Sequence, residues 1–154
     1  MKIGVAGDLP EIFLMGTYFD TCLSVGNLNE MSVLTNAYDA NKQVVFLASV
    51  SSAGRRQVIA RQLVAVSRGF QLLGYNTYVN DPGFAPAYVE QLNAAVARFV
   101  GRLAARSNLE LAEEGAPEPI GDHFWWDDDA VVWPETARAA CSQNRAEAEL
   151  PATC

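Results

Sequence analysis

The clearest hydrophobic pattern in the chain lies between Ala85 and Arg106. Apolar side chains recur there at steps of three and four residues, namely Tyr88, Leu92, Val96, Phe99, Val100 and Leu103. This spacing places them on one face of an amphipathic helix, and it predicts that Phe99 and Leu103 belong to the core. Pro86 suits the first helical turn, because the N–H that proline lacks would be unpaired there, and Ser107 with Asn108 is expected to end the helix.

Three segments upstream of this helix have the composition of β-strands. Residues 43–50, 57–66 and 70–79 are rich in β-branched and aromatic residues and are separated by short turn-like sequences. They predict three consecutive antiparallel strands, with Arg55 and Arg56 at an exposed hairpin. Arg61 alternates with Ile59 and Leu63, and this pattern predicts that Arg61 lies on the less buried face of the sheet.

The remaining segments complete a prediction of one α+β domain over residues 1–149. Residues 109–112 are expected to form a short strand, 113–121 a loop, and 123–133 a strand, an acidic turn and a second strand. Residues 135–149 favour a helix, and 150–154 a frayed end. The expected fold is a central, mostly antiparallel sheet packed on one long amphipathic helix.

Composition narrows the classes of partner. Half of the 154 residues are apolar, which suffices for one sizeable core, and the net charge of −7 argues against nucleic-acid binding. The charge is uneven: residues 42–106 hold eight basic and two acidic side chains, whereas residues 107–154 hold two and eleven. Internal pairing of these regions is the simpler interpretation, and an anion-binding surface is the alternative.

The cysteines and the N-terminal residues favour a cytoplasmic protein that does not enter a membrane. Three widely separated cysteines, Cys22, Cys141 and Cys154, show no metal-binding or redox spacing, so reduced thiols are expected. Asp8 and Glu11 interrupt the first apolar stretch before a signal peptide or membrane span could form.

The order of three strands, a long helix and a further strand over residues 43–112 resembles the acyl-CoA N-acetyltransferase (GNAT) superfamily. The likeness is closest at residues 78–88 (YVNDPGFAPAY), which resemble that family's junction between strand and helix. The resemblance implies that backbone N–H groups of this junction hold the pyrophosphate of coenzyme A at the helix N-terminus. Lys42, Arg61, Tyr78 and Asn80 would then bind the anionic cofactor.

This junction departs from the family's Gly-rich signature. Of the expected Arg/Gln-x-x-Gly-x-Gly/Ala pattern only Gly83 remains, and Pro86 removes an amide donor. Ala85 and Ala87 add Cβ atoms where glycine would permit close approach of a phosphate. We therefore expect coenzyme A to bind weakly or not at all, and the resemblance supports the fold more than the activity.

A second resemblance is to an uncharacterised bacterial domain type. It rests on short matches such as Thr21-Cys22-Leu23, Asp39-Ala40-Asn41-Lys42 and Val58-Ile59-Ala60-Arg61. The resemblance implies no chemistry. It directs attention to five positions, which are Cys22, Asn41, Lys42, Arg61 and Tyr78.

Cys22 and His123 are the candidate catalytic residues. A nucleophilic thiolate needs a nearby base, and His123 is the only histidine, with Asp122 or one of Asp127–Asp129 available to orient its ring. Such a set would resemble a thiol hydrolase. The alternative is that Cys22 packs in the core, as free cysteines commonly do.

The segment around Trp125 and Trp126 combines aromatic and acidic residues. The two tryptophans could clamp a ligand or partner, or complete a small core. Asp127, Asp128 and Asp129 follow directly and read as a solvated turn, because the spaced oxygen ligands of a calcium loop are missing and no metal is expected.

These observations favour a small-molecule or protein-binding module whose site lies at the open end of the sheet beyond Tyr78. The expected ligand-binding residues are Lys42, Arg61, Tyr78, Asn80, Trp125 and Trp126. An acyl-CoA-dependent acyltransferase and a Cys22-dependent thiol hydrolase are the alternatives. The favoured module requires no cofactor.

Overall fold

A mixed β-sheet forms the centre of the protein. The computed structural model describes residues 1–6, 8–80, 83–113 and 130–149. Its strands are β1 (Lys2–Val5), β2 (Lys42–Val50), β3 (Arg56–Val66), β4 (Gln71–Val79), β5 (Glu110–Leu111) and β6 (Ala130–Val131). The predicted three-stranded antiparallel sheet is confirmed as β2, β3 and β4, with β1 added antiparallel to β2. The expected α+β class, with a mostly antiparallel sheet, is therefore also confirmed.

Two short strands share the outer edge of β4. β5 pairs with Gln71 and Leu72 in parallel, and β6 pairs with Gly74 and Tyr75 in antiparallel orientation. The long helix between β4 and β5 provides the crossover that a parallel pair requires. β5 and β6 thus pair with successive parts of the same edge of β4.

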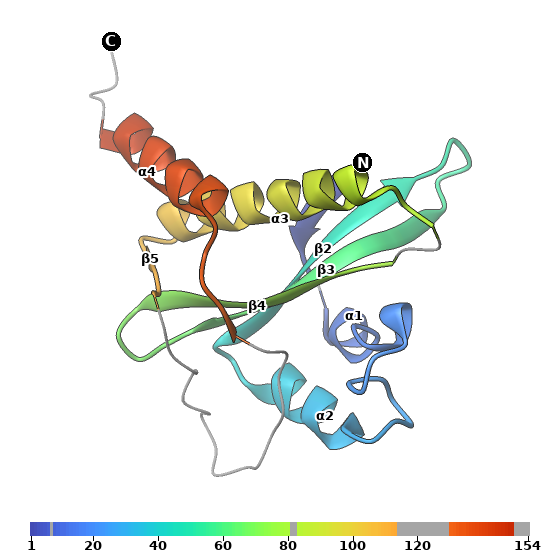
Figure 1. The fold of residues 1–154 in the computed structure, drawn as a ribbon. Helices are drawn as coiled ribbons and strands as arrows, with labels where there is room; N and C mark the ends of the chain where they lie inside the picture. Colours follow the sequence, from blue (N-terminus) through green and yellow to red (C-terminus); the bar gives the residue numbers. More distant parts are fainter. Residues whose placement is uncertain (7, 81–82, 114–129, 150–154) are drawn as a thin grey trace.

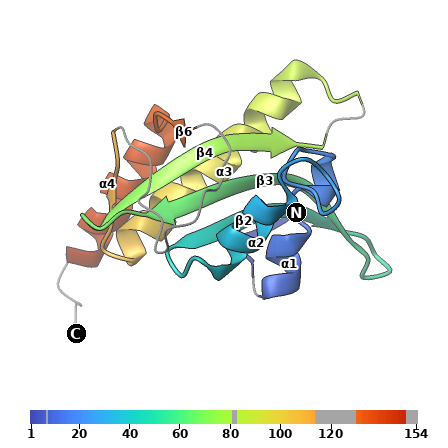
Figure 2. The ribbon, with the colours of Figure 1, turned by 90° about the horizontal axis from the view of Figure 1, so that it is seen from below.

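Helices cover both faces of the sheet (Figures 1 and 2). On one face lie α1 (Leu9–Phe13), the short 3₁₀ helix η1 (Thr17–Phe19) and α2 (Glu30–Tyr38). On the other face lie α3 (Pro86–Arg106) and α4 (Glu135–Glu149). Each face has its own apolar cluster, so the sheet is buried on both sides. This explains why the sequences of its central strands are nearly continuous apolar runs.

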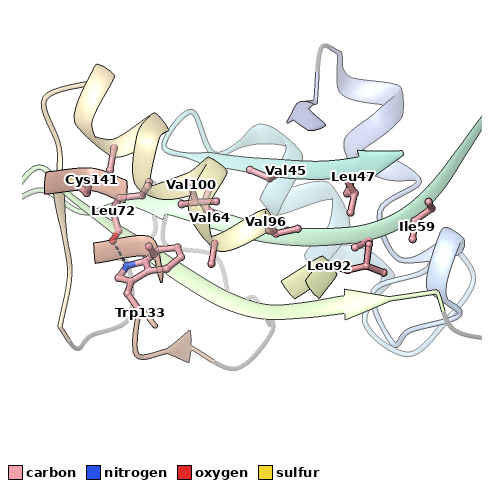
Figure 3. Packing of buried hydrophobic residues seen from close by; sticks show 14 residues of the cluster. Val45, Leu47, Ile59, Val64, Leu72, Leu92, Val96, Val100, Trp133 and Cys141 are labelled. Atoms are coloured by element: carbon pink, nitrogen blue, oxygen red, sulfur yellow. Dashed lines mark hydrogen bonds between the residues drawn. The ribbon is translucent and has the colours of Figure 1, made fainter. Parts of the chain in front are cut away.

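The long helix α3 matches the prediction closely. Pro86 occupies its first turn, Ser107 is the C-cap, and Asn108 adopts a left-handed φ of 54°, as residues just beyond a helix end often do. Leu92, Val96 and Val100 point into the core (Figure 3). Phe99 and Leu103 are only partly buried, because they lie to one side of this inward face. Their assignment as core residues was therefore too strong.

A β-bulge interrupts the pairing of β3 with β4. Gln62 pairs with Thr77, but Val64 pairs with Gly74, so β4 has one residue more than β3 across this interval. A bulge leaves part of the ladder unpaired and bends the strand. The Gln62 side chain compensates, because its Nε2 donates a hydrogen bond to the carbonyl of Tyr75 over 2.8 Å.

Trp133 fastens the C-terminal part of the chain to β4. Its indole is 2% exposed and donates through Nε1 to the carbonyl of Leu72 over 2.9 Å (Figure 3). The ring lies against Gly74, where any side chain would collide with it. The backbone N–H of Ala112 donates to the same Leu72 carbonyl, so one acceptor binds the residues that follow β5 and β6.

Several sequence expectations concern the two ends of the chain. No element was predicted before residue 42, and β1, α1, η1 and α2 were missed. The short strand and the last helix are confirmed as β5 and α4. Of the expected loop 113–121, the segment 123–133 and the frayed end 150–154, the structure describes only residue 113 and residues 130–133. The first strand expected in 123–133 therefore lies outside the described residues. Across the described helices, none is long and apolar enough to cross a membrane.

Candidate functional site

Arg61 is completely buried, which corrects the expectation that it lies on the less buried face. Its exposed fraction is 0%, and it sits on β3 beneath the 3₁₀ helix η1. The guanidinium stacks on the Tyr78 ring at 4.3 Å from the centroid and lies 5.8 Å from the Phe19 centroid. It also donates to Thr21 Oγ1 over 3.4 Å. Arg61 does point away from the face that Ile59 occupies, as the strand alternation predicts. The face to which Arg61 points is buried as well, because η1 and the segment after it cover that face.

Asn80 joins Arg61 and Tyr78 at the same end of the sheet. Its side-chain Nδ2 donates to the Tyr18 carbonyl over 3.3 Å. A cleft of about 470 Å³ opens beside it, lined by Tyr18, Arg56, Gln57, Val58 and Asn80. Arg56 in this lining is ion-paired with Glu11 and lies 5.6 Å above the Phe46 ring. Three of the predicted binding residues are therefore together, and contacts within the protein engage each of them.

Lys42 lies elsewhere on the sheet. It pairs with Ala65, four residues along β3 from Arg61, which corresponds to about 13 Å at the usual rise of a strand. Its side chain is buried, and Nζ donates to Asn36 Oδ1 over 2.7 Å with Asp39 Oδ2 at 3.4 Å. Lys42 thus ties the end of α2 to the start of β2.

The candidate catalytic pair cannot be assembled within the described part of the chain. Cys22 is exposed in the segment between η1 and α2 and carries a free thiol. His123, Trp125, Trp126 and Asp127–Asp129 lie outside the described residues. Among the residues that are described, no three His, Cys, Asp or Glu side chains form a cluster that could hold a metal ion.

A polar cleft of about 440 Å³ lies on the opposite face of the sheet, between β4, α3 and the start of α4. β4 supplies Asn76 and Thr77, and α3 supplies Glu90 and Asn93. Gln62, Tyr75 and Thr136 also line it, and its apolar wall is formed by Ala94, Ala97, Val131, Val132, Trp133 and Pro134. Clefts of this size that combine an apolar wall with a few polar groups are the usual form of small-molecule sites.

Gln62 lines this cleft from β3 and is its most buried amide side chain. Its exposed fraction is 4%, and its Nε2 is occupied by the Tyr75 carbonyl. That bond fixes the orientation of the amide, because a carbonyl accepts only from the NH₂ end. Its Oε1 is buried and has no hydrogen-bond partner among the described residues. A buried acceptor without a partner is costly, and a buried water commonly satisfies such an atom.

The described lining of the cleft contains no cationic side chain. Glu90 is its one charged residue, and no described residue forms an ion pair with it. The nearby buried cation, Arg61, points to the opposite face of the sheet. The electrostatic character of this lining is therefore acidic.

Sequence reasoning missed this cleft because its residues give no local motif. Gln62 stands inside an apolar strand, and Glu90 and Asn93 occupy polar positions of an amphipathic helix, where such residues are normally solvated. A signal was present in one place: Gln62 lies on a strand whose neighbouring residues are almost all buried. A glutamine in a strand buried on both faces requires a partner.

Comparison of this chain with protein-family models, with curated proteins and with solved structures gave no match.

Proposed function

We propose that this protein is a small-molecule-binding module and that its ligand lies in the cleft between β4 and α3. The observation that supports this most is the cleft itself, in which polar side chains of β4 and α3 stand beside an apolar wall. The volume of about 440 Å³ fits a ligand of modest size. Polar side chains on both walls can fix its orientation, while the alanines and valines contact its apolar part.

Three probes with one aromatic frame and different end groups test this proposal: phenethylamine, 2-phenylethanol and 3-phenylpropionate. Each is titrated into ¹⁵N-labelled protein, and the side-chain amide signals of Gln62, Asn76 and Asn93 are followed by NMR. We expect at least one probe to shift these signals in a saturable manner. Replacing Ala94, which lines the cleft, with phenylalanine should abolish the shifts by filling the space.

Ala139→Phe is the matched control, because Ala139 is exposed on α4 and is not part of the cleft lining. It should leave the titration unchanged. The proposal fails if none of the three probes moves the amide signals, or if the shifts persist in Ala94→Phe.

An acyl-CoA-dependent acyltransferase is the second candidate. The crossover from β4 through α3 to a parallel β5 favours it, because this is the order of elements that resembles the GNAT superfamily. Ala85 provides no side-chain cap, which would leave the Ala87 N–H available to an anion, while the Tyr88 N–H donates to the Ala85 carbonyl. Pro86 at the first helical turn, with Ala85 and Ala87 beside it, opposes this candidate.

Coenzyme A is expected to bind weakly, with an affinity that falls as salt is added. Few amides are available at the junction, so the remaining attraction is electrostatic, and exposed charges are screened within about 8 Å at physiological salt. Calorimetry at two salt concentrations measures this. A dissociation constant in the low micromolar range that survives added salt would make the acyltransferase the better description.

A further inference from the structure

We infer that the outer side of α2 is a dimerisation surface, on which a second copy of this chain packs through the same residues. The surface consists of Leu28, Met31, Leu34 and Tyr38, and it is called the α2 face below. α2 lies below the sheet in Figure 1, whereas the cleft lies on the side of α3 and α4. The inference is therefore independent of the proposed function.

α2 has the reverse of the usual amphipathic pattern. A surface helix normally turns apolar side chains inward and polar ones outward. In α2 the polar Ser32 and Asn36 are 3% and 1% exposed, whereas Met31 and Tyr38 are 64% and 83% exposed. Asn36 is held inside because its Oδ1 accepts a hydrogen bond from Lys42 Nζ. Packing within one copy thus explains the inward polar residue but not the outward apolar ones.

The side chains of the α2 face form one stripe along the helix. Met31, Leu34 and Tyr38 follow one another at steps of three and four residues, which places them on the same side. The N–H of Glu30 donates to the carbonyl of residue 27, and the N–H of Ser32 to that of residue 29, so the helical turns continue backwards. Leu28, which is 92% exposed, therefore lies one turn before Met31. A stripe with this spacing can pack against an identical antiparallel stripe, as neighbouring helices do in bundles.

The area of the α2 face suits a dimer. The exposed fractions of its four residues correspond to about 500 Å², at about 200 Å² for a whole large side chain. Single exposed apolar residues are common, but a group of this size usually marks an interaction site. Two such faces in contact would bury about 1,000 Å², which is the lower limit for a specific protein interface. We therefore expect a reversible dimer.

The charge around the α2 face favours a second copy over other occupants. Residues 3–41 contain no Lys or Arg, so the face lacks the basic residues with which surface helices bind anionic membranes. The only charged residue between positions 21 and 38 is Glu30, and its Oε2 accepts a hydrogen bond from the Gly26 N–H. Two copies of a chain with a net charge of −7 repel each other unless the surfaces in contact are nearly uncharged. The α2 face meets this condition.

Sedimentation velocity over about 1 μM to 1 mM protein tests the inference, and we expect the parent protein to change from monomer to dimer within this range. The variant that combines Met31→Lys with Tyr38→Lys should raise the dimer dissociation constant at least about thirtyfold, because each substitution enters a symmetric interface twice. Both side chains are exposed in the single copy, so the fold should be retained, which circular dichroism checks. Phe70→Lys is the matched control. Phe70 is equally exposed but lies in the turn between β3 and β4, and its replacement should leave dimerisation unchanged.

A charge exchange shows whether the α2 face contacts its own copy. The variant that combines Met31→Glu with Tyr38→Glu should also be monomeric, and mixing it with the lysine variant should restore a dimer, because opposite charges then meet across the contact. A parent protein that stays monomeric, or a dimer that persists in the lysine variant, overturns the inference. A mixture that stays monomeric would mean that the α2 face contacts a different surface, and the inference is then wrong as well. Co-sedimentation of a monomeric parent with phosphatidylcholine vesicles would assign the face to a membrane instead.

Discussion

Replacing Trp133 with alanine is expected to lower the free energy of unfolding by about 3–5 kcal/mol, as measured by urea denaturation. Truncation of a buried aromatic side chain typically costs this much, because both the buried area and the packing around it are lost. Trp133 is 2% exposed and belongs to the larger apolar cluster beneath α3. With total stabilities of about 5–15 kcal/mol, such a loss would be a large fraction of the whole.

Trp133→Phe serves as the control for this prediction. Phenylalanine retains most of the ring but not the N–H donor to Leu72. Leu72 keeps its second bond, from the Ala112 N–H, so the polar part of the loss should be only about 0.5–1.5 kcal/mol. A loss below about 1 kcal/mol in Trp133→Ala would show that the indole does not anchor the C-terminal segment to β4.

Replacing Gly101 with alanine is expected to lower the free energy of unfolding by about 2 kcal/mol. On an exposed helix this change would stabilise by up to about 1 kcal/mol, since alanine is the better helix former. Here the added Cβ would collide with the backbone carbonyl of Ala137 on α4. A backbone atom cannot rotate away, so α4 must shift, and overpacking of this kind typically costs about 1–3 kcal/mol.

Gly69→Ala is the matched control for Gly101→Ala. Gly69 lies in the exposed turn between β3 and β4, its φ is not in the left-handed region, and a Cβ there meets only the Ser67 hydroxyl at 3.6 Å. We expect it to be neutral or slightly stabilising. A Gly101→Ala variant as stable as the parent protein would mean that α3 and α4 are not in such close contact.

The elements that sequence predicts well are those with a strong local pattern. The periodicity of α3, its proline start and its Ser107–Asn108 end are all local, and the structure reproduces them. The strands β2, β3 and β4 were found because their runs are long and rich in β-branched residues. The first 41 residues were missed because β1 and α1 are only four and five residues long.

Burial across distant segments could not be predicted. Arg61 has the alternation expected of a strand, yet the cover over it comes from Phe19 and Thr21, about 40 residues earlier. Lys42 read as a polar turn residue, but Asn36 and Asp39 enclose it. In both cases the local sequence is the same whether the side chain is buried or solvated.

The cleft illustrates the same limit for function. Its polar residues come from three elements, namely Gln62 on β3, Thr77 on β4 and Asn93 on α3, and none is part of a recognisable motif. Of the predicted binding residues, Arg61, Tyr78 and Asn80 lie together at one end of the sheet, and their role in binding stays a prediction. The unpaired atom of Gln62 depends on a β-bulge, which the sequence pattern does not reveal.

That bulge lets β4 hold one extra residue while the side chains beyond it keep their faces. Gly74 and Thr77 are three residues apart, and both face the α3 side, whereas a regular strand would place them on opposite faces. If the same residues paired regularly, with no bulge, Tyr78 would turn into the cleft and Thr77 would lie under the Arg61 guanidinium. Among related chains, a single-residue deletion in this interval would therefore remove the bulge and leave Thr77 and Tyr78 on the faces that they occupy here.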